Sequence, residues 1–358
     1  MTSPRPRNCI SQIPAYVAGK PPRRREGLTT YKLSSNENPF PPLPGVVQAA
    51  AAAAEQMNRY PDMGNTALYE ALSEKLGLTA DRLAVATGSV ALIYQLVQAF
   101  CEPGDEVVYA WRSFEAYPIA VAAAGARSVP VPVTTDGGHD LDAMAAAIGD
   151  RTKAVLVCTP NNPTGPSVTQ TELDAFLDRV PAHVLVVVDE AYVEFVRMSD
   201  AVDGVATLRA RDNVISTRTF SKAYGLAGFR VGYAAAPAPI AAALRAVSLP
   251  FGVSNVAQAA AIASLRAEAE LLERVDALVA ERERVVKGLA DVGLVVPEPQ
   301  GNFVWFAAGD RTLDLAAAAD ELGIVIRPFA GDGARISIGE TEANDRVIEL
   351  ARRFSLDT

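Results

Sequence analysis

The middle of the chain alternates between helical stretches and short runs that are almost wholly apolar. These runs are VVYA at 107–110, AVLVC at 154–158, VLVVV at 184–188 and NVIS at 213–216. Strands that are apolar on both faces are typical of a parallel sheet with helices on each side. The pattern from about residue 65 to 245 therefore predicts an α/β domain built on a mostly parallel sheet.

The two flanks have different patterns. Residues 1–30 are rich in proline and arginine without sustained periodicity, which predicts an extended N-terminal arm. After Pro250 a long helical stretch, about 255–292, precedes short strands and a closing helix, which predicts a smaller α+β domain. We therefore expect a large domain over 31–250, whose first segment can pack with the small domain, and a small domain over 251–358.

Length and composition agree with this division. A chain of 358 residues with 49% apolar and 21% charged residues is ordinary for a globular protein of two domains. Its formal net charge of −9 disfavours broad attraction to nucleic acid or an anionic membrane. No apolar run reaches the ~18 residues of a membrane span, and the start lacks a signal-peptide pattern. We expect a cytoplasmic protein with no nucleic-acid or membrane partner.

Cysteines and histidines are few. Cys9, Cys101 and Cys158 are far apart and lack the paired spacing of metal knuckles or disulfide frameworks, which favours a reducing compartment. His139 and His183 are the only imidazoles, and neither lies near a serine or cysteine nucleophile motif or near another ligand. Serine-hydrolase triads and histidine-rich metal sites are therefore disfavoured, and we expect no metal.

Polar clusters follow several of the apolar runs. They are TGS at 87–89, TPNNPTG at 159–165, DEAY at 189–192 and TFSK at 219–222. In open parallel sheets, ligands bind outside the carboxyl ends of the strands. We therefore expect these clusters to converge on one site.

Three side chains of these clusters suit a polar ligand. Asp189 ends an apolar run, where a carboxylate needs a cation or a strong donor, although it could instead cap a following helix. Tyr192 can bring its phenol to the same place. Asn162 offers an amide at the mouth of the sheet, although TPNNPTG could also be a plain turn.

Other side chains suit a phosphate. The TGS turn before an apolar helix exposes backbone N–H groups, which bind phosphate at helix N-termini. Thr219 and Ser221 add hydroxyls, and Arg230 adds a planar guanidinium. Lys222 is notable because the 33 basic residues are mostly arginine. A buried amine near hydroxyls, an arginine and a strand-end aspartate is suited to Schiff-base chemistry.

The ordered motifs resemble a known family. NENP, TPNNPTG, DEAY, TFSKAYGLAGFRVGY and RISIG occur in the order found in the fold type I pyridoxal 5'-phosphate aminotransferases, in the branch of the histidinol-phosphate aminotransferases. The resemblance runs from about residue 10 to the end. It implies a transferase with pyridoxal 5'-phosphate as cofactor, and amino acid and 2-oxo acid as substrates.

The resemblance also implies residue roles in cofactor binding. Lys222 bonds covalently to the cofactor and, once displaced by substrate, moves a proton between substrate and cofactor. Asp189 pairs with the pyridine nitrogen, Tyr192 and Asn162 bind the ring oxygen, and Phe114 stacks on the ring. The residues that hold the phosphate are Ser89, the backbone at Val90, Thr219, Ser221 and Arg230.

Further implied roles involve the substrate and a second subunit. Tyr60 matches a tyrosine that reaches the phosphate of the neighbouring subunit's cofactor, which implies a homodimer with shared active sites. Tyr16, on the arm, matches a residue that closes over the partner's substrate. Arg335 matches the arginine that clamps the substrate anion, and Asn162 also faces the substrate. The roles of Asn36 and Glu37 in NENP stay open between substrate contact and turn formation.

Three positions bear on the substrate class. Enzymes for histidinol phosphate carry a carboxylate or amide after the GS of the phosphate turn, and tyrosines in the equivalents of RSF and LPF. Here these places hold Val90, Phe114 and Phe251, which favour an apolar ring at roughly 25 cal/mol per Å² buried. The segments WRSFEAYP and LPFGVSN also resemble the phenylalanine or aromatic amino acid aminotransferases of that branch. We therefore expect an aromatic amino acid aminotransferase, and the resemblance implies 2-oxoglutarate as its acceptor.

Two alternatives are kept. Histidinol-phosphate aminotransferase would use the same cofactor chemistry. A non-catalytic cofactor-binding regulator is disfavoured, because the 30-residue arm is too short for a helix-turn-helix domain.

Overall fold

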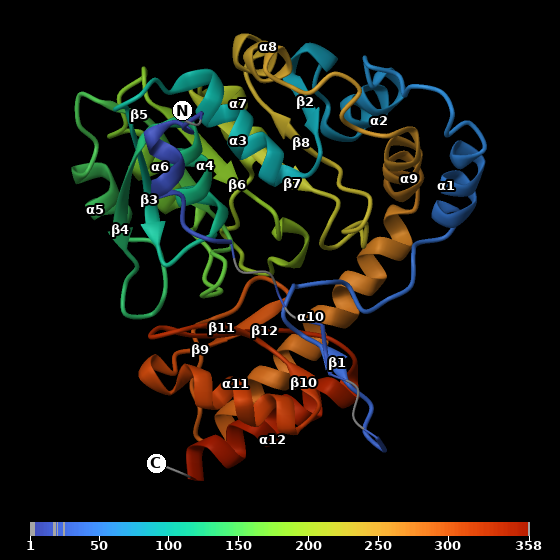
Figure 1. Cartoon of the computed structure of the whole chain (residues 1–358), viewed down its shortest axis with the longest axis vertical. Helices are drawn as coiled ribbons and strands as arrows, with labels where there is room; N and C mark the ends of the chain where they lie inside the picture. Colours follow the sequence, from blue (N-terminus) through green and yellow to red (C-terminus); the bar gives the residue numbers. More distant parts are fainter. Residues whose placement is uncertain (1–3, 17–18, 20, 24–25, 357–358) are drawn as a thin grey trace.

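The computed structural model describes residues 4–16, 19, 21–23 and 26–356. Figure 1 shows a larger part built around one sheet, and a smaller part that contains the C-terminal strands and helices. In the described part of the chain, no helix is long and apolar enough to cross a membrane.

The large sheet has seven strands in the order β2-β8-β7-β6-β5-β3-β4. All neighbouring pairs are parallel except those of β8, which runs antiparallel to β2 and β7. The predicted apolar runs lie on β3, β5, β6 and β7, so the predicted fold class is confirmed. The strands are β2 Leu83–Ala86, β3 Glu106–Trp111, β4 Arg127–Pro132, β5 Thr152–Cys158, β6 Leu185–Asp189, β7 Val214–Thr219 and β8 Gly232–Ala235.

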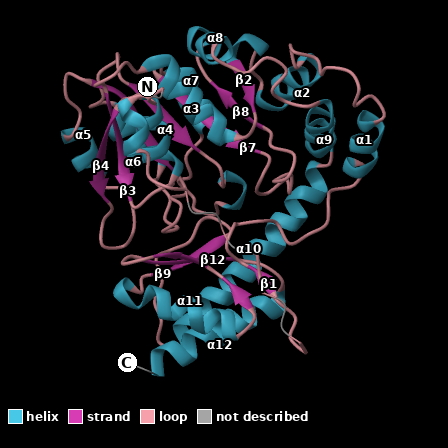
Figure 2. Cartoon of the chain, in the orientation of Figure 1, coloured by secondary structure: helices cyan, strands magenta, loops and turns pink. Residues whose placement is uncertain are grey.

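Helices cover both faces of this sheet (Figure 2). Successive residues of β6 show why the strand is apolar throughout: Val186 and Val188 belong to one buried cluster, whereas Leu185 and Val187 belong to another. The α-helices before residue 250 are α1 Val46–Ala54, α2 Thr66–Leu76, α3 Ser89–Phe100, α4 Ala116–Ala124, α5 Leu141–Ala146, α6 Gln170–Leu177, α7 Gly204–Ala210 and α8 Ala238–Ala246. Short 3-10 helices are η1 Asn8–Gln12, η2 Ala80–Arg82 and η3 Val193–Phe195.

The C-terminal part is built on a small antiparallel sheet of order β11-β12-β9. Its strands are β9 Phe303–Phe306, β11 Arg327–Phe329 and β12 Gly333–Ser337, and the short β10 Ile324–Val325 precedes β11. The helices after residue 250 are α9 Asn255–Arg266, α10 Glu268–Asp291, α11 Thr312–Glu321 and α12 Thr341–Leu356, with the 3-10 helix η4 Gly309–Arg311. The stretch expected as one helix is thus two helices that meet at Ala267, whose φ of −96° and ψ of 37° are non-helical.

Two pairings connect sequence-distant segments. Strand β1 (Tyr31–Lys32) pairs in parallel with β10, so the segment after the arm joins the C-terminal part. Helix α9 instead packs against α1 and α2, beside the large part (Figure 1). The domain boundaries at residues 30 and 250 stay a prediction.

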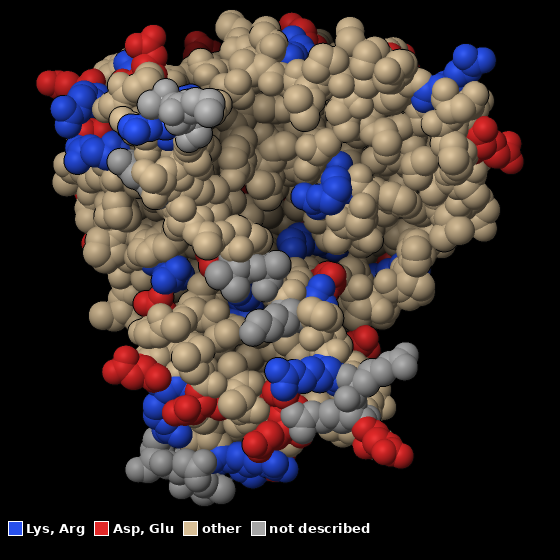
Figure 3. Space-filling view, viewed as in Figure 1, with Lys and Arg blue, Asp and Glu red and all other residues tan. Residues whose placement is uncertain are grey.

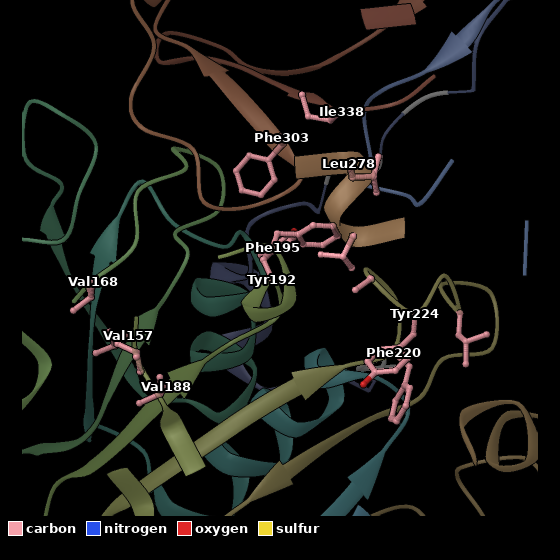
Figure 4. Packing of buried hydrophobic residues seen from close by; sticks show 14 of the residues in the cluster. Val157, Val168, Val188, Tyr192, Phe195, Phe220, Tyr224, Leu278, Phe303 and Ile338 are labelled. Atoms are coloured by element: carbon pink, nitrogen blue, oxygen red, sulfur yellow. The ribbon is translucent and has the colours of Figure 1, made fainter. Parts of the chain in front are cut away.

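One hydrophobic cluster continues from the large sheet into the small one. Figure 4 shows Tyr192 and Phe195 between Val188 of β6 and Phe303 of β9. The rings of Tyr192 and Phe303 meet edge to face, with centroids 5.0 Å apart. The two sheets are therefore held against each other directly beside the carboxyl end of β6, where Asp189 lies.

Candidate active site

A cavity lies at the carboxyl ends of the central strands, between the large sheet and β12. The surface is hollowed between the two parts of the molecule, with basic side chains beside the hollow (Figure 3). Most of the predicted site residues line this cavity: Tyr16, Ser89, Val90, Phe114, Asn162, Asp189, Tyr192, Thr219, Ser221, Lys222, Arg230 and Arg335. The expected convergence of the polar clusters is therefore present in the structure.

Lys222 follows β7 and projects its amine into the cavity. Its Nζ donates a hydrogen bond of 2.9 Å to the carbonyl oxygen of Ser35 and lies 5.8 Å from the centre of the Tyr192 ring. Burial, and secondly the positive charge of Arg335, lower the pKa of the Lys222 amine to about 7. A large fraction of the amine is then neutral near pH 7, which is the form that attacks a carbonyl carbon.

Asp189 is a buried carboxylate whose partners in the chain are neutral donors. Its Oδ2 accepts a hydrogen bond of 2.7 Å from the hydroxyl of Tyr117, and its Oδ1 accepts one of 3.4 Å from Thr217. Burial raises the pKa of Asp189 to about 6. The helix-cap alternative does not apply, because η3 begins after Tyr192 and has no side-chain cap. The carboxylate is therefore suited to a positively charged group of a ligand.

A concave anion site lies at the start of α3. Gly88, with φ of 88°, precedes the helix, and a Cβ there would stand 2.7 Å from Nη2 of Arg230. A Cβ at Gly232 would stand 2.6 Å from the backbone nitrogen of Ser89. Arg230 donates a hydrogen bond of 3.1 Å to Oγ of Ser221. The N–H groups of a helix N-terminus, hydroxyls and a guanidinium thus face one space, as a phosphate requires.

Asn36 supports the phenol of Tyr192. The buried Asn36 donates a hydrogen bond of 2.9 Å from Nδ2 to the hydroxyl of Tyr192, and its Oδ1 accepts one of 3.0 Å from Ser337. The φ of Asn36 is 52°, a turn conformation that asparagine tolerates. Glu37 instead pairs with Lys32 at 2.9 Å on partly exposed surface. Asn36 therefore shapes both the turn and the site.

Arg335 of β12 lies buried on the opposite wall of the cavity. Its Nη1 donates a hydrogen bond of 2.6 Å to Oδ1 of Asn162, and its Nη2 donates one of 2.8 Å to the carbonyl oxygen of Ser34. Its buried Nε has no hydrogen-bond partner within the described residues. An arginine with an unused buried donor is suited to a carboxylate.

Three predicted residues occupy exposed positions. Tyr60 and Phe251 lie outside the cavity and stack on each other, with centroids 4.7 Å apart. Tyr60 is 81% exposed and Phe251 is 41% exposed. Tyr16 is 57% exposed and lines the cavity of its own chain, whereas the resemblance implies a role in the partner's site.

Several cavity residues were not predicted. Arg327 and Glu115 form an ion pair of 2.6 Å at the cavity wall, and Phe329 also lines it. Tyr117, which binds Asp189, follows Phe114 by three residues at the start of α4. Its place three residues after Phe114, in the turn that leads into α4, was the signal that could have found it.

Pyridoxal 5'-phosphate fits these residues. The glycine-lined anion site matches its phosphate, the buried Asp189 carboxylate matches a protonated pyridine nitrogen, and the Lys222 amine matches its aldehyde. A mostly parallel sheet with this set at its carboxyl edge defines a fold type I pyridoxal-phosphate-dependent enzyme.

Comparison with known proteins identifies the family. A family model described as aminotransferase class I and II matches residues 29–350, so the chain belongs to this family of pyridoxal-phosphate-dependent enzymes. It is 58% identical over 353 residues to an aromatic amino acid aminotransferase of Streptomyces avermitilis, covering 99% of this chain and 98% of the relative. It is 52% identical to the aromatic amino acid aminotransferase of Rhodococcus jostii, covering 98% and 96%.

Solved structures agree with this assignment. The histidinol-phosphate aminotransferase of Sinorhizobium meliloti, in complex with pyridoxal-5'-phosphate, superposes with a TM-score of 0.87 at 31% identity over 99% of both chains. The aspartate aminotransferase of Thermus thermophilus with maleate superposes with a TM-score of 0.81 at 26% identity over 92% of both chains. The protein is therefore a pyridoxal-phosphate-dependent aminotransferase.

Proposed function

We propose that this aminotransferase takes its amino group from aromatic amino acids. The observation that carries the proposal is the apolar wall formed by Val90 and Phe114, in the same cavity as Lys222 and Arg335. Phe329 extends this wall. An aromatic ring gains roughly 25 cal/mol per Å² buried there, whereas each unpaired phosphate oxygen costs about 1–3 kcal/mol. The relatives named as aromatic amino acid aminotransferases support the same substrate class.

We assign the substrate carboxylate to Arg335. Arg335 has donors for both carboxylate oxygens. They are the unused Nε and the two Nη atoms, which bind Asn162 and Ser34 in this structure. For the acceptor, 2-oxoglutarate, a second carboxylate needs another cation. Arg327 lines the same cavity and is paired with Glu115 at 2.6 Å. In this assignment the second carboxylate takes the place of Glu115 as the partner of Arg327.

The roles proposed for the chemistry follow from the contacts. Pyridoxal phosphate, when bound, supplies a carbonyl that accepts the amino group and a ring that withdraws electrons from the substrate Cα–H bond. The neutral Lys222 amine takes the Cα proton and returns it to the carbon that carried the carbonyl. Asp189 holds the proton on the ring nitrogen, and Tyr192 and Asn162 donate to the ring oxygen. Phe114 orients the ring by stacking.

We also propose that the active unit is a homodimer. Tyr60 and Phe251 are stacked but exposed, and the nearby Met63 and Leu249 are 61% and 74% exposed. Large apolar side chains gathered on one face of a monomer mark an interaction surface. The role that the resemblance implies for Tyr60 makes a second copy of this chain the occupant of that surface.

A second candidate function keeps one observation in its favour. Arg327, which suits a second carboxylate, equally suits the phosphate of histidinol phosphate. The apolar side chains of Val90 and Phe114 disfavour that substrate, because they offer no hydrogen-bond partner to a phosphate.

Half-reactions of the holoenzyme separate the two candidates. Phenylalanine added alone should discharge the visible absorption band of the bound cofactor within one turnover, and 2-oxoglutarate added next should restore it. A band that persists with phenylalanine but is discharged by histidinol phosphate would reject the aromatic assignment. A band that is discharged by phenylalanine but not restored by 2-oxoglutarate would reject only the acceptor.

A further inference from the structure

Tyr117 of α4 contacts two of the groups to which we assign the cofactor ring. Its side chain is fully buried, and its hydroxyl donates a hydrogen bond of 2.7 Å to Oδ2 of Asp189. Its ring and that of Phe114 form a T-shaped pair, with centroids 5.6 Å apart and planes at 85°. One side chain therefore links the acidic partner of the ring nitrogen to the aromatic residue that stacks on the ring.

The position of the Tyr117 hydroxyl is fixed by local structure. Phe114 precedes α4 and Tyr117 is its second residue, and in the turn that joins them the backbone N–H of Tyr117 donates a hydrogen bond of 3.0 Å to the carbonyl oxygen of Phe114. On the other side, the ring of Tyr109 from β3 packs against Tyr117, with centroids 5.8 Å apart. The hydroxyl is thus held at Asp189 by packing on two sides of its ring.

Among the described residues, Tyr117 is the nearer of two side-chain donors to Asp189, which also accepts from the backbone of Ala191. The other side-chain donor, Thr217 of β7, lies at 3.4 Å, which is a weaker hydrogen bond than one of 2.7 Å. The titratable groups that face Asp189 are Tyr117 from α4, Cys158 from β5, and Glu190 and Tyr192 from its own segment. The Glu190 carboxylate is already paired with Arg218 at 3.2 Å.

We propose that Tyr117 is a positioning residue that keeps the Asp189 carboxylate oriented and ionised for the protonated ring nitrogen of the cofactor, and that supports Phe114 against the ring. This extends the assignment of Asp189 made above and is independent of the substrate class. A carboxylate that accepts a short hydrogen bond on one oxygen presents its other oxygen in a defined direction.

The electrostatic consequence can be measured. Burial raises the pKa of Asp189 to about 6, and among the groups that lower it the Tyr117 hydrogen bond is the largest. Without the hydroxyl, the carboxyl group retains its proton to higher pH. A protonated carboxyl group cannot compensate a positively charged ring nitrogen. When the pH is lowered, cofactor affinity should therefore begin to fall at a higher pH in a variant without the hydroxyl than in the wild type.

The test uses the apoenzyme and pyridoxamine 5'-phosphate, which has the ring and phosphate but no aldehyde to bond with Lys222. Its Kd is measured from about pH 5 to 9 for the wild type and for Tyr117→Phe. In the wild type, affinity should fall below a midpoint near pH 6. In Tyr117→Phe the midpoint should move up by about one pH unit, with a roughly tenfold loss of affinity below it.

Tyr109→Phe is the matched control. It removes a hydroxyl from the same aromatic cluster, and that hydroxyl is paired with Ser128 rather than Asp189. Its midpoint should match the wild type. An unchanged midpoint in Tyr117→Phe, or an equal shift in Tyr109→Phe, overturns the proposal.

Two more variants keep the test decisive. The Lys222 amine and the ligand phosphate also titrate in this range, so the comparison is made between variants. In the Asp189→Asn background, Tyr117→Phe should no longer move the midpoint, and a shift that persists there refutes the link through Asp189. Thr217→Val removes the weaker donor and should shift the midpoint less than Tyr117→Phe. A larger shift in Thr217→Val than in Tyr117→Phe would show that Tyr117 is not the main donor. If Tyr117→Phe lowers the Tm too far for titration, the shift measured in Thr217→Val still tests whether donors to Asp189 set the midpoint.

Discussion

Nη1 of Arg335 donates a hydrogen bond of 2.6 Å to Oδ1 of Asn162, which joins β12 of the small sheet to the loop after β5 of the large sheet. The two residues are 173 positions apart in the chain. The arginine to which we assign the substrate carboxylate is thus oriented only when the two parts of the molecule pack together.

Replacing this arginine should affect the substrates and spare the cofactor. Arg335→Lys keeps the charge but loses the planar fork, so kcat/KM for both the amino acid and the 2-oxo acid should fall about 100-fold. The dissociation constant of pyridoxal phosphate should stay near the wild-type value. Arg352→Lys on the partly exposed α12 serves as a control. A parallel loss of cofactor affinity would mean that Arg335 acts by holding the fold.

Lys222 should make the stability of the apoenzyme depend on pH. The folded-state pKa of about 7 lies below the unfolded value of about 10.4, so between these values the unfolded chain binds the additional proton. The free energy of unfolding should therefore rise with pH across this window. Below pH 7 the folded protein is destabilised by the full cost of keeping the amine buried. The slope approaches 1.4 kcal/mol per pH unit.

Lys222→Met should flatten this dependence and stabilise the apoenzyme at pH 6 relative to the wild type. Denaturant unfolding at pH 6 and 9.5 measures both effects. Equal pH dependence in the two proteins would show that the pKa of the amine is not perturbed.

In the holoenzyme, Lys222→Ala should lose activity and the visible cofactor band, and retained activity would refute the role of Lys222.

The proposed sharing of active sites between two subunits predicts complementation between variants. Lys222→Ala and Tyr60→Ala, each weakly active or inactive alone, are unfolded and refolded together. Half of the dimers are then mixed, and each mixed dimer has one site with both native residues, so about a quarter of the sites should regain activity. If Tyr60 acted in its own subunit, the mixed dimers would contain no complete site, and mixing would restore nothing.

Glu190 and Arg218 should be important for stability rather than catalysis. Glu190 is 1% exposed and accepts hydrogen bonds from both Arg218, at 3.2 Å, and Ser216. Glu190→Gln leaves the largely buried guanidinium without its counter-charge, which should cost about 3 kcal/mol in the free energy of unfolding. Asp291→Asn, in an exposed pair with Lys287, should change it little. Similar denaturation midpoints for both variants would contradict this account.

The residues predicted from the sequence share a cause. Asp189 is the last residue of a buried strand, and Asn162 and Lys222 follow the ends of two others. The topology of a parallel sheet brings the carboxyl ends of its strands together independently of the loop conformations. Their placement needed only the apolar runs and the motifs that follow them. The positive partner expected for Asp189 is assigned to the cofactor, because the chain itself supplies Tyr117 and Thr217.

The features that were not predicted depend on tertiary packing. Tyr117 reaches Asp189 only because α4 lies against the sheet, and Arg327 meets Glu115 only across the two parts of the molecule. The break between α9 and α10 falls on Ala267, although alanine is the strongest helix former. Here packing of α9 on α1 and α2 overrides the local preference.

Substrate preference tests the central claim most directly. Steady-state kcat/KM for phenylalanine and for histidinol phosphate should be measured side by side on the holoenzyme, with 2-oxoglutarate as acceptor in both series. The apolar wall of Val90 and Phe114 predicts that phenylalanine is preferred by about 100-fold, the equivalent of one or two unpaired phosphate oxygens. A preference for histidinol phosphate would contradict the account.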